Sequence, residues 1–89
     1  CVTLWLTNIF YDSESDVDHS LELAQREWDK FTQQDFTLIV VSNELGMGVH
    51  PMNEVARKFA DLQGWMNQYI AKSANEVQLM VSGIPVKIK

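Results

Sequence analysis

Cysteine and proline are scarce in this sequence, and it has no long apolar run. A single cysteine among 89 residues excludes an internal disulfide and with it the class of disulfide-stabilised mini-proteins. The longest apolar runs, such as residues 38–41, fall far short of the roughly 18 residues that a membrane-spanning helix needs. Two prolines and four glycines exclude a collagen-like repeat. We therefore expect a globular protein with no membrane span.

Basic residues are also few. The chain carries 7 Lys and Arg against 12 Asp and Glu, a net charge of −5. The acidic excess lies in residues 12–35, and the rest of the chain is close to neutral. A duplex nucleic-acid binder would carry a basic stripe, which this sequence lacks, so we expect no nucleic-acid partner. A site for one phosphorylated ligand remains compatible with the near-neutral remainder.

Length and composition indicate one small domain. The chain is 46% hydrophobic and 10% aromatic, which is ordinary for a globular protein, and residues 1–89 are predicted to form a single domain. The sequence begins with Cys1 rather than Met. We expect it to be a piece of a longer protein.

Apolar spacing predicts two helices and leaves one segment open. Residues 17–34 and 52–74 carry apolar stripes at three- and four-residue steps, which is typical of amphipathic helices. Residues 12–18 are polar and predict a loop with a helix N-cap. Gly64 lies inside the second helix, where we expect it to mark close packing. Residues 1–11 fit a strand or a helix equally well.

Three strands are predicted in the remainder. Residues 36–42 are apolar on both faces and rich in β-branched side chains, a pattern typical of a central parallel strand covered by helices. Residues 77–82 form a second strand, so that strand, helix and strand make a right-handed βαβ unit. After Gly83, residues 84–89 alternate around Pro85 and predict an edge strand. Because a strand so apolar needs neighbours on both sides, we expect part of the sheet to lie outside this chain.

The loop after strand 36–42 is the candidate site. Ligands of open α/β sheets bind at the carboxyl ends of the strands, where Ser42, Asn43 and Glu44 lie. Glu44 either holds a metal or a ligand hydroxyl, or orders its own loop through backbone N–H groups. Gly46 and Gly48 do not have the spacing of a phosphate-binding P-loop. The acidic residues 12–18 lack the glycine and the glutamate that a calcium loop requires.

Several motifs together resemble one family. Residues 40–51 (VVSNELGMGVHP) are similar to the glycine-containing block of the adenosylcobinamide kinase/adenosylcobinamide-phosphate guanylyltransferase family. Residues 56–68 resemble its following helix, residues 81–89 its C-terminal strand pair, and residues 1–8 the segment after its acidic Walker-B-like residue. The matches span nearly the whole chain but only the C-terminal half of such an enzyme.

The resemblance implies a fold and an activity. The fold is α/β, part of a P-loop NTPase-like three-layer domain whose parallel sheet has an antiparallel C-terminal edge strand, incomplete in this chain. Residues 1–11 are then a helix. The family phosphorylates adenosylcobinamide with GTP or ATP and Mg, and then transfers GMP from GTP to the phosphate, in cobalamin biosynthesis. It implies a cytoplasmic homo-oligomer, a trimer.

The resemblance also assigns candidate residues. Thr3, Asn43, Glu44, Gly46 and Gly48 match positions near the nucleotide or corrinoid cleft, and they are the predicted cofactor-binding residues. No catalytic or metal-binding residue is predicted. The family's P-loop and its guanylylated histidine lie in the N-terminal half and have no counterpart here. His50 lies in the glycine block and is not that histidine.

This sequence alone is therefore expected to be inactive, because nothing in it cradles a triphosphate. The alternative is a non-catalytic α/β module that is stable by oligomerising.

Overall fold

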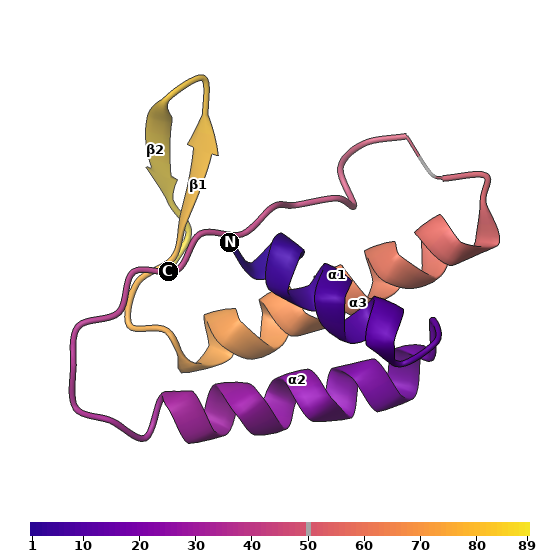
Figure 1. The fold of residues 1–89 in the computed structure, drawn as a ribbon. Coiled ribbons are helices and arrows are strands. Elements are labelled where there is room, and N and C mark those ends of the chain that lie inside the picture. Colours follow the sequence, from indigo (N-terminus) through magenta and orange to yellow (C-terminus); the bar gives the residue numbers. More distant parts are fainter. Residues whose placement is uncertain (50) are drawn as a thin grey trace.

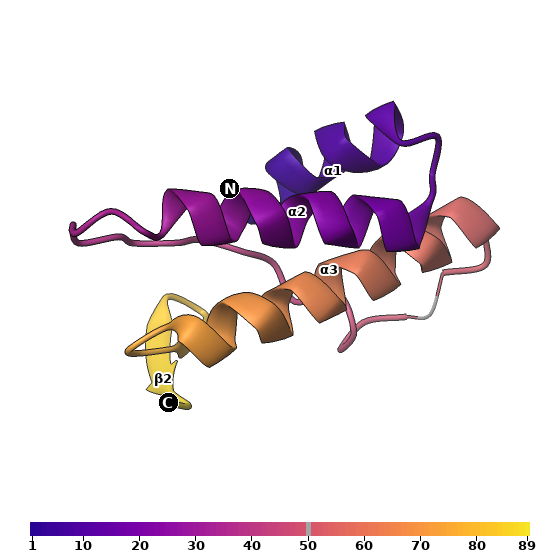
Figure 2. The same ribbon diagram turned by 90° about the horizontal axis from the view of Figure 1, so that it is seen from below.

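A computed structural model describes residues 1–49 and 51–89. Within that part of the chain three helices and one two-stranded sheet are formed. The helices pack together, and the hairpin stands at one end of them (Figure 1). A long connection leaves the second helix and runs past the helices before the third begins (Figure 2). The element bounds are α1 Val2–Asp12, α2 Val17–Phe31, α3 Glu54–Ser73, β1 Gln78–Val81 and β2 Ile84–Lys87.

The starts of α2 and α3 are fixed by side-chain caps. Asp16 precedes α2, and its carboxylate accepts a hydrogen bond from the backbone N–H of His19 at 3.1 Å. Asn53 precedes α3, and its Oδ1 accepts from the N–H of Val55 at 2.8 Å. Each cap satisfies a backbone donor that has no partner within its helix. The predicted N-cap region at 12–18 is confirmed, and α3 begins two residues later than predicted because Asn53 is its cap.

The core lies between the three helices. Phe10 of α1 meets Phe59 of α3 edge to face, with ring centroids 5.6 Å apart. The buried residues of α1 recur at every fourth position, which settles residues 1–11 as a helix. The apolar stripes predicted for α2 and α3 supply the rest of the core, although Met52, before α3, is 94% exposed. The buried apolar residues are Val2, Leu6, Phe10, Ala24, Trp28, Leu62, Met66 and Ile70.

Gly64 does not mark close packing, contrary to the sequence-based expectation. A Cβ built at this position meets no atom within 4 Å. Its place in α3 is therefore not imposed by a neighbouring element.

The strand predicted over residues 36–42 is not formed in the described structure. The segment belongs to no helix or strand. It is joined to α1 by a hydrogen bond from the N–H of Val2 to the carbonyl of Val41 at 2.9 Å. Ile39 is 86% exposed. The physical reason is that a strand requires a neighbouring strand for its N–H and C=O groups, and no described segment pairs with it. The predicted parallel βαβ unit is therefore absent from the described residues.

The C-terminal hairpin is antiparallel, as predicted. Val81 pairs with Ile84 across a two-residue turn. Ser82 and Gly83 both have positive φ, 51° and 76°, which is the pattern of a type I′ turn and matches the twist of the strands. Pro85 lies in β2, which has one neighbouring strand and tolerates a missing amide donor.

Candidate functional site

Two of the predicted site residues meet where α1 begins. The side-chain Nδ2 of Asn43 donates a hydrogen bond to Thr3 Oγ1 at 2.8 Å. It also lies 3.8 Å from Cys1 Sγ. The sequence placed Thr3 and Asn43 in two separate motifs, and the fold brings them into contact.

The backbone explains why they meet. The first N–H groups of a helix have no partner within the helix. The N–H of Val2 instead donates a hydrogen bond to the carbonyl of Val41. This bond places the start of α1 beside the end of the extended segment. Thr3, the residue after Val2, and Asn43, two residues after Val41, then face each other.

Helix α3 contributes two amide side chains to the same place. Gln63 and Asn67 are four residues apart, so they share one face of the helix. Gln63 Nε2 donates to Ser42 Oγ and to Asn67 Oδ1, both at 3.0 Å. Ser42 Oγ donates to Asn67 Oδ1 at 2.6 Å, and Asn67 Nδ2 donates to the carbonyl of Asn43 at 2.9 Å.

We call this set the polar junction, which consists of Thr3, Ser42, Asn43, Gln63 and Asn67. Sequence reasoning gave no role to Gln63 or Asn67. The available signal was an amide at each of two positions four apart, inside an otherwise apolar stretch of α3. Gln63 is fully buried, which its type alone does not indicate.

The loop that follows is ordered by its own carboxylate. Glu44 Oε1 accepts a hydrogen bond from the N–H of Gly46 at 2.6 Å. A Cβ at Gly46 would lie 2.9 Å from that oxygen, so glycine lets the carboxylate approach the backbone. Of the two roles left open for Glu44, the structure contains the loop-ordering one. Packing does not require a glycine at position 48, since a Cβ there would lie 4.0 Å from the carbonyl oxygen of Leu45.

The electrostatics of the junction are nearly neutral. Its five side chains are amides and hydroxyls, with the carboxylate of Glu44 as the adjoining charge. Among residues 1–49 and 51–89, no Lys or Arg side chain donates a hydrogen bond to it. Such groups fit the hydroxyl or amide edge of a ligand. They do not by themselves fit a triphosphate, which requires positive charge or converging N–H groups.

No metal centre is evident in the described part of the chain, where no group of three or more His, Cys, Asp and Glu side chains converges. His50, which the sequence placed in the glycine block, lies outside the described residues. Nor does any described helix combine the length and the apolar character needed to cross a bilayer.

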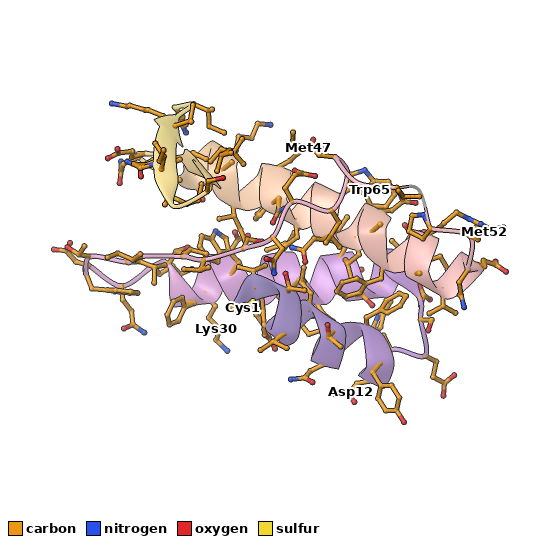
Figure 3. The ribbon with its side chains drawn as sticks, turned by 90° about the horizontal axis from the view of Figure 1, so that it is seen from above. Cys1, Asp12, Lys30, Met47, Met52 and Trp65 are labelled. Carbon is orange, nitrogen blue, oxygen red and sulfur yellow. The ribbon has the colours of Figure 1, made fainter. Side chains whose placement is uncertain are left out.

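An apolar groove adjoins the junction. It has a volume of about 460 Å³ and lies between the first turns of α1, the last turns of α2 and residues 38–41. Trp5 Nε1 donates to Glu27 Oε2 at 3.1 Å beside it. Cys1 belongs both to this groove and to the edge of the junction, at the start of α1 (Figure 3).

Comparison with known proteins identifies the class. Residues 1–88 match the family profile described as cobinamide kinase / cobinamide phosphate guanyltransferase. The chain belongs to this family, CobU.

Particular relatives agree with that assignment. The chain is 37% identical over 106 residues to the bifunctional adenosylcobalamin biosynthesis protein CobU of Escherichia coli, covering 100% of this chain and 55% of that protein. It is 36% identical over 90 residues to CobP of Pseudomonas aeruginosa, covering 100% and 50%. With CobU of Salmonella typhimurium it shares 54% identity over 52 residues, covering 58% and 29%. The chain thus spans about half the length of the curated relatives it matches.

Proposed function

We propose that this chain forms the C-terminal part of a bifunctional enzyme of cobalamin biosynthesis. That enzyme phosphorylates adenosylcobinamide with GTP or ATP and then transfers GMP from GTP to adenosylcobinamide phosphate. The observation that carries the proposal is the family match over residues 1–88, together with two bifunctional relatives that match all of this chain with about half of their own length.

In this proposal, the part of the enzyme that lies outside this chain completes the fold. Residues 36–42 become a central parallel strand of a P-loop-type sheet, and the missing part supplies the neighbouring strands. The exposure of Ile39 and its neighbour Val40, 86% and 37%, supports this, because apolar side chains on both faces of an extended segment suit a strand covered on both sides. The triphosphate and Mg then lie against residues outside this chain.

The residues of this chain line the cleft in that enzyme. Asn43 is held by Thr3, and its Oδ1, which accepts no hydrogen bond from residues 1–49 and 51–89, is the group that would meet the ligand. Glu44 keeps the loop closed on Gly46, and Gly48 follows in the same loop. An amide and hydroxyl edge of this kind fits the neutral, hydrogen-bonding periphery of a corrinoid better than it fits a phosphate.

Calorimetry with GTP tests the proposal. We expect no heat of binding with the 89-residue chain alone. The same chain joined to the part of the Pseudomonas relative that it does not match should bind GTP and phosphorylate adenosylcobinamide, with that part alone as the control. GTP binding by the 89-residue chain, or a folded joined protein with neither activity, would contradict the proposal.

A non-catalytic oligomerising module is the second candidate. The apolar side chains Val81, Ile84 and Ile88 of the hairpin region are 52–65% exposed, and exposed apolar strands promote association between copies. Light scattering separates the two. A stable trimer of the 89-residue chain favours the module, whereas a trimer that forms only in the joined protein favours the enzyme.

A further inference from the structure

The polar junction contains a buried acceptor with no partner. Gln63 is fully buried, and its Oε1 receives no hydrogen bond from the described residues. Its Nε2, in contrast, donates twice. A buried oxygen without a donor destabilises the folded chain. An apolar side chain of the same length would avoid that penalty, so stability alone does not explain a glutamine at this position.

What Gln63 does provide is geometry. It holds Ser42 Oγ and Asn67 Oδ1 at 3.0 Å each, which leaves Asn67 Nδ2 directed at the carbonyl of Asn43. A peptide carbonyl held in this way fixes the orientation of its own residue. The Asn43 side chain is then set against Thr3.

We propose that Gln63 and Asn67 are positioning residues, which fix Asn43 and the loop that begins there for the reaction of the complete enzyme. Neither touches a reacting atom in this proposal. The inference rests on the proposed function for its effect on catalysis, but its structural half applies to the 89-residue chain itself.

The substitution Gln63→Met tests it, because methionine keeps the unbranched length and removes both polar groups. In the joined protein we expect kcat for adenosylcobinamide phosphorylation to fall about tenfold to a hundredfold, the scale of a displaced catalytic group. KM should stay within about threefold, and the melting temperature should be unchanged or higher. Gln68→Met is the matched control, since Gln68 lies on the same helix, is exposed and is outside the junction. It should change none of these.

A second variant isolates the bond to the loop. Asn67→Asp keeps the oxygen that accepts from Ser42 and Gln63, but it removes the donor to the Asn43 carbonyl. We expect the same loss of kcat as for Gln63→Met. Full activity in both variants, in an active parent protein, would overturn the inference.

A spectroscopic readout separates this inference from the proposed function. In the 89-residue chain, the side-chain NH₂ signals of Asn43 and the backbone amide of Gly46 should exchange with water faster in Gln63→Met than in Gln68→Met. Should the joined parent protein prove inactive, the proposed function fails, and these signals still decide the positioning. Unchanged exchange in Gln63→Met would overturn it.

Discussion

Asn43 donates a side-chain hydrogen bond to the hydroxyl of Thr3 across 2.8 Å and 40 positions of sequence. The bond ties the end of an extended segment to the first turn of α1. Neither polar side chain is needed to start α1, because the hydrogen bond from the N–H of Val2 to the carbonyl of Val41 already satisfies its first amide. The pair therefore offers a direct way to perturb the junction without disturbing the core.

Thr3→Val should weaken this tie and little else. Valine has the same shape and lacks the hydroxyl, so we expect the free energy of unfolding to fall by about 0.5–1.5 kcal/mol. Urea denaturation measures the change. Thr7→Val is the control on the same helix, since its hydroxyl bonds only to the backbone carbonyl of Thr3 and an exposed change of this kind stays within about 0.5 kcal/mol. Equal losses in both variants would show that the Asn43 bond contributes nothing.

Tyr69 should give the chain an alkaline pH dependence. Its hydroxyl lies 2.7 and 2.8 Å from the two carboxylate oxygens of Asp29. The hydrogen bond to Asp29, then burial and the negative charge, raise the pKa of Tyr69 above its ordinary value. The unfolded chain therefore loses this proton at lower pH than the folded chain does.

The direction of the pH effect on stability follows from this order of proton loss. The stabilising contribution of Tyr69 is fully present below the ordinary tyrosine pKa of about 10, and it is lost as pH rises through the raised, folded value. Unfolding measured between pH 8 and pH 11 should show the decline in the parent chain. The decline should be smaller in Tyr69→Phe and in Asp29→Asn. An identical slope in all three proteins would contradict the assignment.

Gly64→Ala should stabilise the chain. Glycine inside a helix is less favourable than alanine by about 0.5–1 kcal/mol, and a Cβ at Gly64 meets nothing within 4 Å. We expect the free energy of unfolding to rise by about that amount, measured by urea denaturation. A fall would mean that this face of α3 is covered by another copy or another part of the protein.

The same substitution at Gly83 should have the opposite sign. Open space surrounds a Cβ at Gly83 as well, but its φ of +76° is strained for alanine. We expect Gly83→Ala to destabilise the hairpin by about 1 kcal/mol. Comparison of the two variants separates backbone strain from packing, because neither position has a neighbour to clash with.

Ile39→Lys should suppress association of the 89-residue chain. Ile39 is 86% exposed in a segment of five exposed apolar residues, and a charge on an exposed, unpaired extended segment opposes pairing between copies. We expect the apparent mass by light scattering to fall toward that of one chain, with Met52→Lys, at an exposed site near α3, as the control. Equal association of both variants would place the contact elsewhere.

Helices α2 and α3 and the hairpin were predictable because their signals are local, whereas the spacing in residues 1–11 left α1 open and only the family resemblance implied a helix there. Residues such as Ala24, Trp28, Leu62 and Met66 recur at helical spacing, and Gly83 before Pro85 indicates a turn by backbone preference alone, although Ser82, which was predicted in the strand, also belongs to that turn. The strand over 36–42 is not formed in the described residues for the opposite reason. Apolar β-branched composition describes a suitable surface, but a strand also needs partners, and these were expected to lie outside this chain.

The residues of the candidate site were likewise predicted only in part. Thr3 and Asn43 were predicted from motifs, yet their contact depends on the fold. Gln63 and Asn67 were missed, because their four-residue spacing places them on one face of α3 but does not show that this face is covered. Whether a glutamine is buried is decided by the segment that covers it, and here that segment includes Ser42, 21 positions away in sequence.

The bond between Val2 and Val41 also bears on the order in which the chain folds. Its donor and acceptor lie 39 positions apart, whereas the N–H of Trp5 meets the carbonyl of Cys1 only four residues away. Because closing a long loop costs conformational entropy, the local bonds of α1 can form before the one that satisfies its first amide. The order of residues along α1 and the order in which its amides find partners therefore do not coincide.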